Sequence, residues 1–266
     1  MDLYGWTELT RAVCGGDVNE VRMLLKEGAN PDQKNAAGNM PLIYASMGGQ
    51  VDMLKVLLPV TSNVNATSHK QWTALHWCAS LGYSNCLEHL LQSGADPNIM
   101  DNCGEIPLQK AMICKNVSIR AARALIQANS RLDLLHFDSQ SIGDDNLGND
   151  VWHKRTAILE MLTYVRCPPR IIKELISMGY VPQNFIANNI HLKQLFVAIH
   201  EKMSSSWTLA ELCRYHIRKP LIQKRGSNVP SLIDKMDIPR PLKNYVSFRE
   251  LNIYESSYNP EEMDVW

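Results

Sequence analysis

The sequence predicts an all-α protein in which helical pairs repeat and stack, followed by a small separate helical module. Apolar and glycine positions recur every 33 residues between residues 5 and 133, which is typical of a stacked repeat. Towards the end of the chain, residues 208–218 carry one apolar stripe at helical spacing. A hydrophobic content of 45% with few glycines and prolines suits helices in both parts.

The composition argues against several classes of protein. Basic and acidic side chains are equal in number, 27 of each, so the chain as a whole has no basic footprint for nucleic acid. The seven cysteines are scattered without the spacing of a zinc site, which favours buried reduced thiols over metal ligands or disulfides. No signal-peptide pattern opens the chain, and no apolar run approaches the ~20 residues of a membrane span. We expect a cytoplasmic, or cytoplasmic and nuclear, protein with no metal, cofactor, nucleic-acid or membrane partner.

Four units are present between residues 5 and 133. Each unit combines a first helix rich in small residues with a second helix that carries paired large apolar residues. The repeated positions are Gly5, Gly38, Gln71 and Gly104, then Leu9, Leu42, Leu75 and Leu108, then Ala12, Ala45, Cys78 and Ala111, and then Leu24-Leu25, Leu57-Leu58, Leu90-Leu91 and, after a two-residue insertion, Leu125-Ile126. The period therefore predicts four helical pairs.

These units resemble the ankyrin repeat. The stretch Trp72-Thr73-Ala74-Leu75-His76 is similar to the Thr-Pro-Leu-His signature of that family, and Gly94-Ala95-Asp96-Pro97-Asn98 is similar to its turn. The resemblance implies a solenoid of helix-turn-helix stacks with hairpin tips and a long concave face, in which each unit packs only against its neighbours. It also implies that His76 ties neighbouring loops together by hydrogen bonds.

The pattern weakens over residues 134–205. Residues 138–150 hold four aspartates and no basic residue, which predicts a solvated acidic loop. Residues 156–162 and 170–179 then resemble one degenerate repeat, with Pro168 and Pro169 at the start of its second helix, where proline is tolerated. Residues 189–203 predict a further amphipathic helix that closes the array.

Residues 206–252 carry a second resemblance, and residues 253–266 form a tail. Four apolar residues lie on one stripe of a short helix that Pro220 ends, and a second cluster contains two prolines in an extended segment. The first cluster is similar to the elongin C-binding half of a SOCS box, and the second to its cullin-binding half. The residues concerned are Leu209, Leu212, Cys213 and Ile217 in the first cluster, and Ile238, Pro239, Leu242 and Tyr245 in the second. Asp237 stands where the family usually has a proline. Without the resemblance, the first stripe would be the core of an ordinary terminal helix.

The residue after each unit's glycine differs in chemistry while its neighbours repeat, as expected when a scaffold leaves one position to a ligand. This position holds Trp6, Asn39, Trp72 and Glu105, and His69, Lys70 and Asn102 lie on the same tips. If its ring is exposed, Trp72 is the best anchor for a target protein, because Trp and Arg dominate interface hot spots. The alternative is that both tryptophans fold back and pack against the array.

The two resemblances together imply a substrate-recognition subunit of a cullin-RING ubiquitin ligase. Its SOCS box would bind elongin C, with elongin B, and a cullin of the fifth type with its RING-finger protein, while the repeats would hold a target protein. No nucleophile-elbow, phosphate-loop, dinucleotide or zinc-protease motif is present, so we expect no catalytic residue in this chain. The alternative is a non-ligase ankyrin scaffold or inhibitor protein whose last helices only cap the array.

Overall fold

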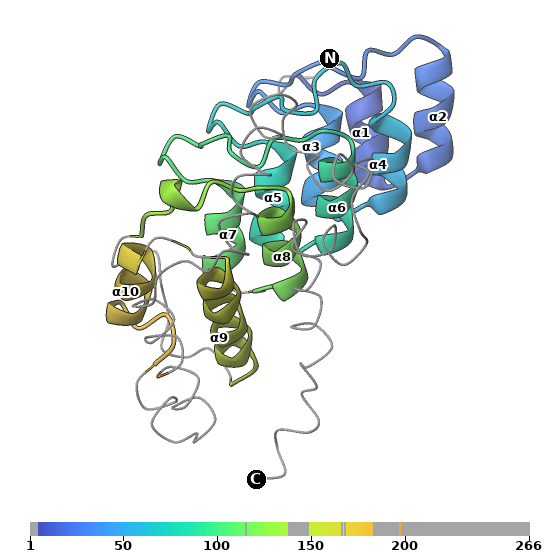
Figure 1. Ribbon diagram of the computed structural model, residues 1–266. Coiled ribbons are helices and arrows are strands. Elements are labelled where there is room, and N and C mark those ends of the chain that lie inside the picture. The colour runs from blue at the N-terminus through green and yellow to red at the C-terminus, as the bar shows by residue number, and fades with distance from the viewer. Residues whose placement is uncertain are drawn as a thin grey trace, which may run out of the picture.

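The computed structural model describes residues 5–114, 116–137, 149–165, 167, 169–182 and 197. Within these residues the chain forms ten α-helices and one short 3-10 helix, with no strand (Figure 1). The elements are α1 (Glu8–Gly15), α2 (Val18–Lys26), α3 (Pro41–Met47), α4 (Val51–Leu57), α5 (Ala74–Leu81), α6 (Ser84–Gln92), α7 (Pro107–Ile113), α8 (Ile119–Gln127), η1 (Leu132–Leu134), α9 (Asn149–Tyr164) and α10 (Pro169–Ser177). The all-α prediction is confirmed.

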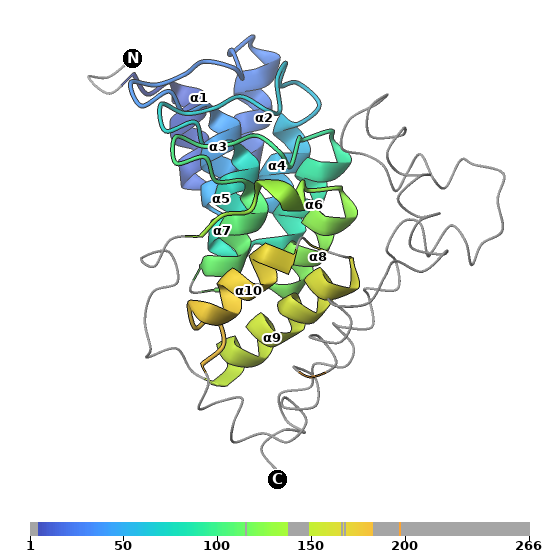
Figure 2. The same ribbon diagram turned by 60° about the vertical axis from the view of Figure 1, so that its left-hand side comes forward.

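The first eight helices form two layers. Helices α1, α3, α5 and α7 pack side by side in one layer, and α2, α4, α6 and α8 form the other, as Figure 2 shows. Each pair is therefore one helical hairpin that contacts the hairpins before and after it. We call the layer of α1, α3, α5 and α7 the inner layer.

The leucines and small residues of the period build the core between the layers. Leu9, Leu42, Leu75 and Leu108 are each at most 1% exposed, and Ala12, Ala45, Cys78 and Ala111 are buried beside them. Small side chains on the inner layer let neighbouring helices approach closely, while the leucines fill the space between layers. One repeated pattern thus gives one continuous core.

Local sequence signals start these helices. Thr7 and Asp17 accept backbone N–H hydrogen bonds as N-caps of α1 and α2, and Pro41 and Pro107 occupy the first turn of α3 and α7. Thr73 forms a capping box with His76 at the start of α5. The short helices of the array therefore have defined starts as well as a buried face.

The glycine of each period occupies a left-handed turn before an inner helix. Gly5, Gly38 and Gly104 have φ of 72°, 75° and 78°, and Gln71, which replaces glycine in the third unit, has φ of 60°. At Gly38 a Cβ atom would lie 2.6 Å from Cδ2 of His69, so the turn needs glycine there for space as well as for φ. Gln71 follows the same backbone path at the cost of steric strain.

Helices α9 and α10 continue the stack beyond the fourth pair. Helix α9 packs on α8 and α10 packs on α9, so the degenerate repeat is a helical pair in the structure. Helix α9 begins at Asn149, so the last two residues of the predicted acidic loop are helical. We call this last pair, α9 and α10, the joint. Tyr180 links it to the array, since its hydroxyl donates a hydrogen bond to the carbonyl oxygen of Met112 on α7 at 3.0 Å.

Several predicted elements lie outside the described residues. These are residues 138–148 of the acidic loop, the amphipathic helix over residues 189–203, apart from Val197, the C-terminal module over residues 206–252 and the tail over residues 253–266. Among the helices that the structure describes, none is both long and apolar enough to cross a membrane.

Candidate functional site: the hairpin tips and the inner layer

The seven residues predicted to meet a target all lie at the tips and differ in exposure. His69, Lys70 and Asn102 are exposed, Trp6, Asn39 and Trp72 are half-buried, and Glu105 is buried. The tips contact one another through the backbone: the amide of His69 donates to the carbonyl of Ala37, and that of Asn102 donates to the carbonyl of Lys70, both at 3.2 Å. The structure therefore brings the predicted residues of units two to four onto one continuous edge.

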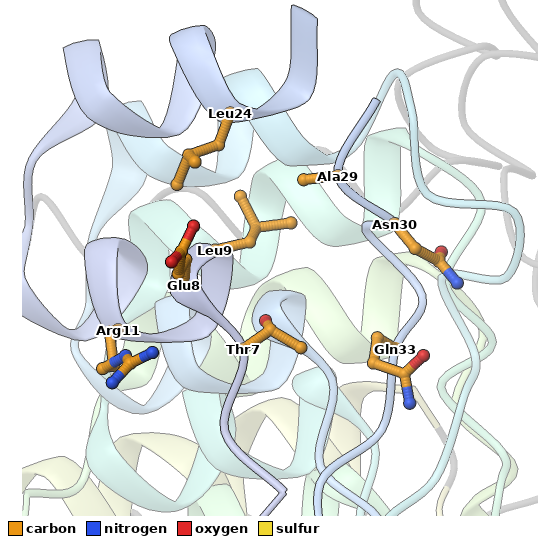
Figure 3. Close-up of a pocket in the computed structure, with 8 residues that line it drawn as sticks. All are labelled: Thr7, Glu8, Leu9, Arg11, Leu24, Ala29, Asn30 and Gln33. Carbon is orange, nitrogen blue, oxygen red and sulfur yellow. The ribbon is translucent and has the colours of Figure 1, made fainter. Parts of the chain in front are cut away.

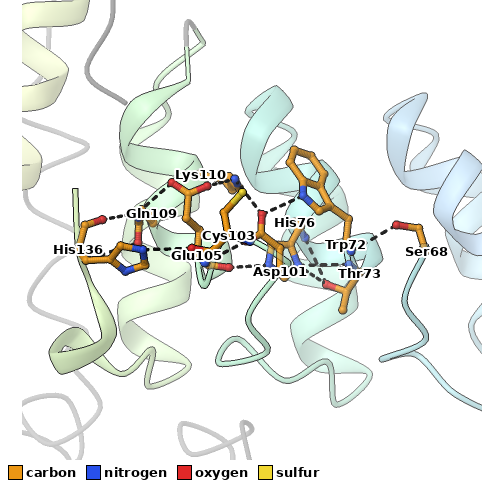
Figure 4. Close-up of polar contacts among 10 residues, drawn as sticks. All are labelled: Ser68, Trp72, Thr73, His76, Asp101, Cys103, Glu105, Gln109, Lys110 and His136. Carbon is orange, nitrogen blue, oxygen red and sulfur yellow. Dashed lines mark hydrogen bonds and ion pairs between the residues drawn. The ribbon is translucent and has the colours of Figure 1, made fainter. Parts of the chain in front are cut away.

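Trp72 is held in place on several sides (Figure 4). Its indole N–H donates a hydrogen bond to Oδ2 of Asp101 at 2.9 Å, and the Nζ atom of Lys110 lies 4.9 Å from its ring centroid. The ring of Trp77 packs against it with centroids 4.5 Å apart. Because Trp72 is half-buried, it combines the two alternatives from the sequence: part of the ring packs on the array and part faces solvent.

Lys110 on α7 is the ion-pair partner of two buried carboxylates from the fourth tip. Its Nζ atom forms ion pairs with Oδ2 of Asp101 at 2.9 Å and with Oε2 of Glu105. Burial by itself would raise the pKa of Asp101, but hydrogen bonds from Lys110 and from the backbone amides of Glu105 and Cys103 bring the pKa below its ordinary value. Burial likewise opposes the Lys110 charge, and the two carboxylates nevertheless raise its pKa. Asp101 and Lys110 are therefore charged at neutral pH.

This network also argues against a metal site at the fourth tip. One potential ligand atom from each of Asp101, Cys103 and Glu105 lies within 4.8 Å of the other two. However, Oδ1 of Asp101 already accepts the backbone amides of Cys103 and Glu105 at 2.8 and 3.0 Å, and Oδ2 accepts the Trp72 indole. The Glu105 side chain contacts Gln109 and Lys110. The cluster ties the tip to α7 and to the preceding unit.

Glu105 thus differs from the target-facing side chain that its position suggested. Its carboxylate points towards α7, because a buried carboxylate needs charged and hydrogen-bonding partners and Lys110 and Gln109 supply them. The side chain of Asn102 also bonds within the array, since its Nδ2 donates a hydrogen bond to the carbonyl of His69 at 3.2 Å. The side chains of His69 and Lys70 remain exposed on the same edge.

His76 joins the third and fourth units, as the resemblance to the ankyrin repeat implied. Its Nδ1 accepts the backbone N–H of Thr73 at 3.2 Å, so the proton lies on Nε2, which donates to the carbonyl of Glu105 at 3.1 Å. Burial lowers the pKa of His76 to about 4. The ring is therefore neutral at physiological pH and its role is structural.

Two aromatic residues of the inner layer were not singled out in the sequence. Tyr44 on α3 packs against Trp6, with ring centroids 5.1 Å apart, and Trp77 on α5 packs against Trp72. Both occupy the same step of the 33-residue period, which holds Arg11 in the first unit and Lys110 in the fourth. A comparison of this second variable position along the period would have found them.

A pocket of about 330 Å³ lies at the first unit (Figure 3). Leu9, Leu24 and Ala29 form its apolar part, with polar side chains around them. Leu24 is half-buried, whereas the equivalent Leu57 and Leu90 are 0% exposed, because each of those units follows another unit. The pocket is therefore the open end of the array, and no residue predicted to bind a target lines it.

Comparison with known proteins assigns both parts of the chain. A family model described as ankyrin repeats (3 copies) matches residues 9–101, and one described as SOCS box matches residues 205–247. The chain combines ankyrin repeats with a SOCS box. The residues predicted to bind elongin C and a cullin fall within the second match, but they lie outside the residues that the structure describes.

Three of the matching relatives each cover about a third of the chain. Ankyrin repeat and SOCS box protein 2 of Homo sapiens is 35% identical over 92 residues, which are 34% of this chain and 14% of that protein. Ankyrin repeat and SOCS box protein 3 of Bos taurus is 37% identical over 86 residues, 31% of this chain and 16% of that protein. Alpha-latrocrustotoxin-Lt1a of Latrodectus tredecimguttatus is 37% identical over 93 residues, 35% and 6% of the two chains. The ankyrin-SOCS chain thus covers a small part of each of these relatives.

Proposed function

We propose that this protein is a substrate-recognition subunit of a cullin-RING ubiquitin ligase. The observation that supports the proposal best is the SOCS-box match over residues 205–247, which follows a stacked array in the same chain. The SOCS box binds elongin C together with elongin B, and recruits a cullin of the fifth type with its RING-finger protein. The array holds a target protein, and the assembly works in the cytoplasm or in both cytoplasm and nucleus.

The contacts with the ligase core follow from the two halves of the SOCS box. Leu209, Leu212, Cys213 and Ile217 enter an apolar surface of elongin C, and Ile238, Pro239, Leu242 and Tyr245 contact the cullin. Asp237 lacks the backbone restraint of the proline usual at its position, so the segment loses more conformational entropy on docking. We expect weaker cullin binding than the usual motif gives, and tighter binding after Asp237→Pro.

The proposed mechanism needs no catalytic group in this chain. Holding a target near the ubiquitin-charged enzyme raises its effective concentration there and orients its lysines. The buried groups fit such a role: His76 is neutral and hydrogen-bonded, and burial raises the pKa of the Cys114 thiol to about 11 and that of Cys167 to about 12. These thiols are protonated at neutral pH and are poor nucleophiles.

Coexpression with elongins B and C tests the proposal. The parent chain should copurify with elongin C, and Leu209→Asp should abolish the complex, because the new carboxylate would be buried without a partner. Lys70→Asp, which places the same charge on an exposed tip, is the matched control and should leave elongin capture intact. A parent chain that is monodisperse alone and captures no elongin C would favour a non-ligase ankyrin scaffold or inhibitor.

A further inference from the structure

We propose that the array binds an extended, acidic segment of its target that carries two apolar side chains three residues apart. This inference rests on the proposed function and specifies the chemistry of its target. Its basis is the surface formed by the inner layer and the first three tips, which we call the recognition surface. Two aromatic pairs and a set of unpaired cations define it.

The aromatic pairs belong to neighbouring units. Trp6 packs on Tyr44 of α3, and Trp72 packs on Trp77 of α5, and all four side chains are half-buried. An aromatic ring that is packed on one side and open on the other loses little side-chain entropy when a partner covers it. Each pair is therefore a preorganised contact site for one apolar side chain of the target.

The spacing of the two pairs sets the spacing in the target. Tyr44 and Trp77 occupy equivalent positions 33 residues apart on the adjacent helices α3 and α5. Axes of packed helices lie ~8–10 Å apart. An extended peptide in the polyproline II conformation has three residues per turn and rises ~3.1 Å per residue, so side chains at positions i and i+3 lie on the same face, about 9 Å apart. An extended segment can thus place one apolar side chain on each pair.

The charges of the recognition surface favour an acidic target segment. Arg11, Lys34 and Lys70 lie on or beside this surface, and none of them forms an ion pair among the described residues; Lys34 donates only to the carbonyl of Thr67, at 3.0 Å. The carboxylates of Asp101 and Glu105 are buried and paired with Lys110. Glu8, at the start of α1, is exposed as well. Carboxylates of a target would therefore find cations here, and lysines would be repelled.

A selection from a random peptide library tests this chemistry on the full chain. The chain is immobilised through its C-terminal end, enriched peptides are sequenced, and their affinities are measured by fluorescence anisotropy. Enriched peptides should carry excess Asp and Glu around two apolar residues at positions i and i+3. Replacing their acids by lysine should weaken binding by at least about 10-fold, as should replacing either apolar residue by serine.

Variants of the chain localise the binding. The double variant Arg11→Glu with Lys70→Glu changes exposed charges and should weaken the enriched acidic peptides by about 10-fold or more. The matched control, Arg22→Glu with Lys26→Glu, makes the same change on exposed positions of α2 and should bind like the parent. Trp77→Ser should remove the preference for one apolar residue of the peptide, and Tyr44→Ser should remove the preference for the other. Both variants should have the same melting temperature as the parent.

Several results would overturn the inference. These are enrichment of basic or uncharged peptides, no enrichment at all, binding of polyglutamate as tight as that of the enriched peptides, or equal loss in the α2 control. Elongin C capture is measured on the same preparations. Intact capture with failed peptide selection would remove this inference alone, whereas loss of capture by the parent chain would remove the proposed function.

Discussion

The array and the joint that follows it each bury a basic side chain, and they do so in different ways. Lys110 on α7 has two carboxylate partners and lies over the Trp72 ring. Arg155 on α9 is 1% exposed, and its Nη1 donates to the carbonyl of Tyr180 at 3.2 Å. The guanidinium lies 5.1 and 4.8 Å from the Trp152 and Tyr180 rings, and its Nε and Nη2 have no hydrogen-bond partner among the described residues. One cation is compensated by charge and the other mainly by aromatic faces.

Repetition supplies polar contacts between successive units of the array. The bonds from Trp72 to Asp101 and from His76 to Glu105 both span 29 residues, because each unit meets the tip of the next in the same geometry. A polar group that faces forward therefore finds a partner at a fixed offset. The 33-residue period weakens after the fourth unit, and with it this supply of partners. Burial lowers the pKa of Arg155, in the direction expected for a cation with little compensation.

Removal of the Lys110 charge should have the largest effect on stability. Lys110→Met would leave the carboxylates of Asp101 and Glu105 buried without their cation and should lower the free energy of unfolding by about 3–5 kcal/mol. Chemical denaturation of parent and variant measures the difference. Lys55→Met removes the partner of Asp52 in an exposed pair and should cost less than about 0.5 kcal/mol. Equal losses in the two variants would show that the buried pair is not special.

Acid should weaken the array through His76. Folding holds the pKa of His76 at about 4, against 6.5 for an imidazole exposed to solvent, so the unfolded chain binds a proton first as pH falls. The contribution of the neutral ring is complete above about pH 6.5 and is lost between pH 6.5 and 4, by up to about 3 kcal/mol. Denaturation series of the parent and His76→Gln over this range measure it. If the stability of the parent falls no more steeply than that of His76→Gln, the loss in acid does not come from the lowered pKa of His76.

The sequence predicted the four helical pairs because the period records local helix signals and contacts between neighbours. It did not show the network around Lys110, since the partners of this side chain follow from the path of the fourth tip rather than from spacing. Glu105 illustrates the limit: its variable position suggested contact with a target, and the structure turns its carboxylate towards Lys110. Tyr44 and Trp77 vary along the period in the same way as Trp72, on helices instead of tips.

Gln71 offers a smaller test within the array, at the one tip where the glycine of the period is missing. Gln71→Gly should remove the strain of φ at 60° and raise the free energy of unfolding by about 0.5–1 kcal/mol, after the extra freedom of glycine in the unfolded chain is subtracted. The converse change, Gly104→Ala, meets only ordinary contacts with His136 and should cost about 1 kcal/mol from φ alone. A destabilised Gln71→Gly would mean that the glutamine side chain contributes more than its backbone strain removes.

Replacement of Arg155 should have the smallest effect, and this separates the joint from the array. Arg155→Met removes a desolvated charge whose burial costs several kcal/mol and keeps an apolar side chain between the Trp152 and Tyr180 rings. The variant loses the cation–π contacts, worth about 2 kcal/mol at a desolvated site, and one hydrogen bond to the Tyr180 carbonyl. These terms nearly cancel, so the free energy of unfolding should stay within about 1 kcal/mol of the parent value or rise.

Hydrogen exchange in α9 and α10, measured beside chemical denaturation, shows whether a change is local to the joint. Lys173→Met removes an exposed cation from α10 and controls for net charge. Protection of α9 and α10 in Arg155→Met should match that in the control. A loss above about 3 kcal/mol confined to these helices would mean that the guanidinium has a charged partner as strong as those of Lys110. In that case the contrast between a compensated array and an uncompensated joint would fail, since both regions would bury their cations by the same means.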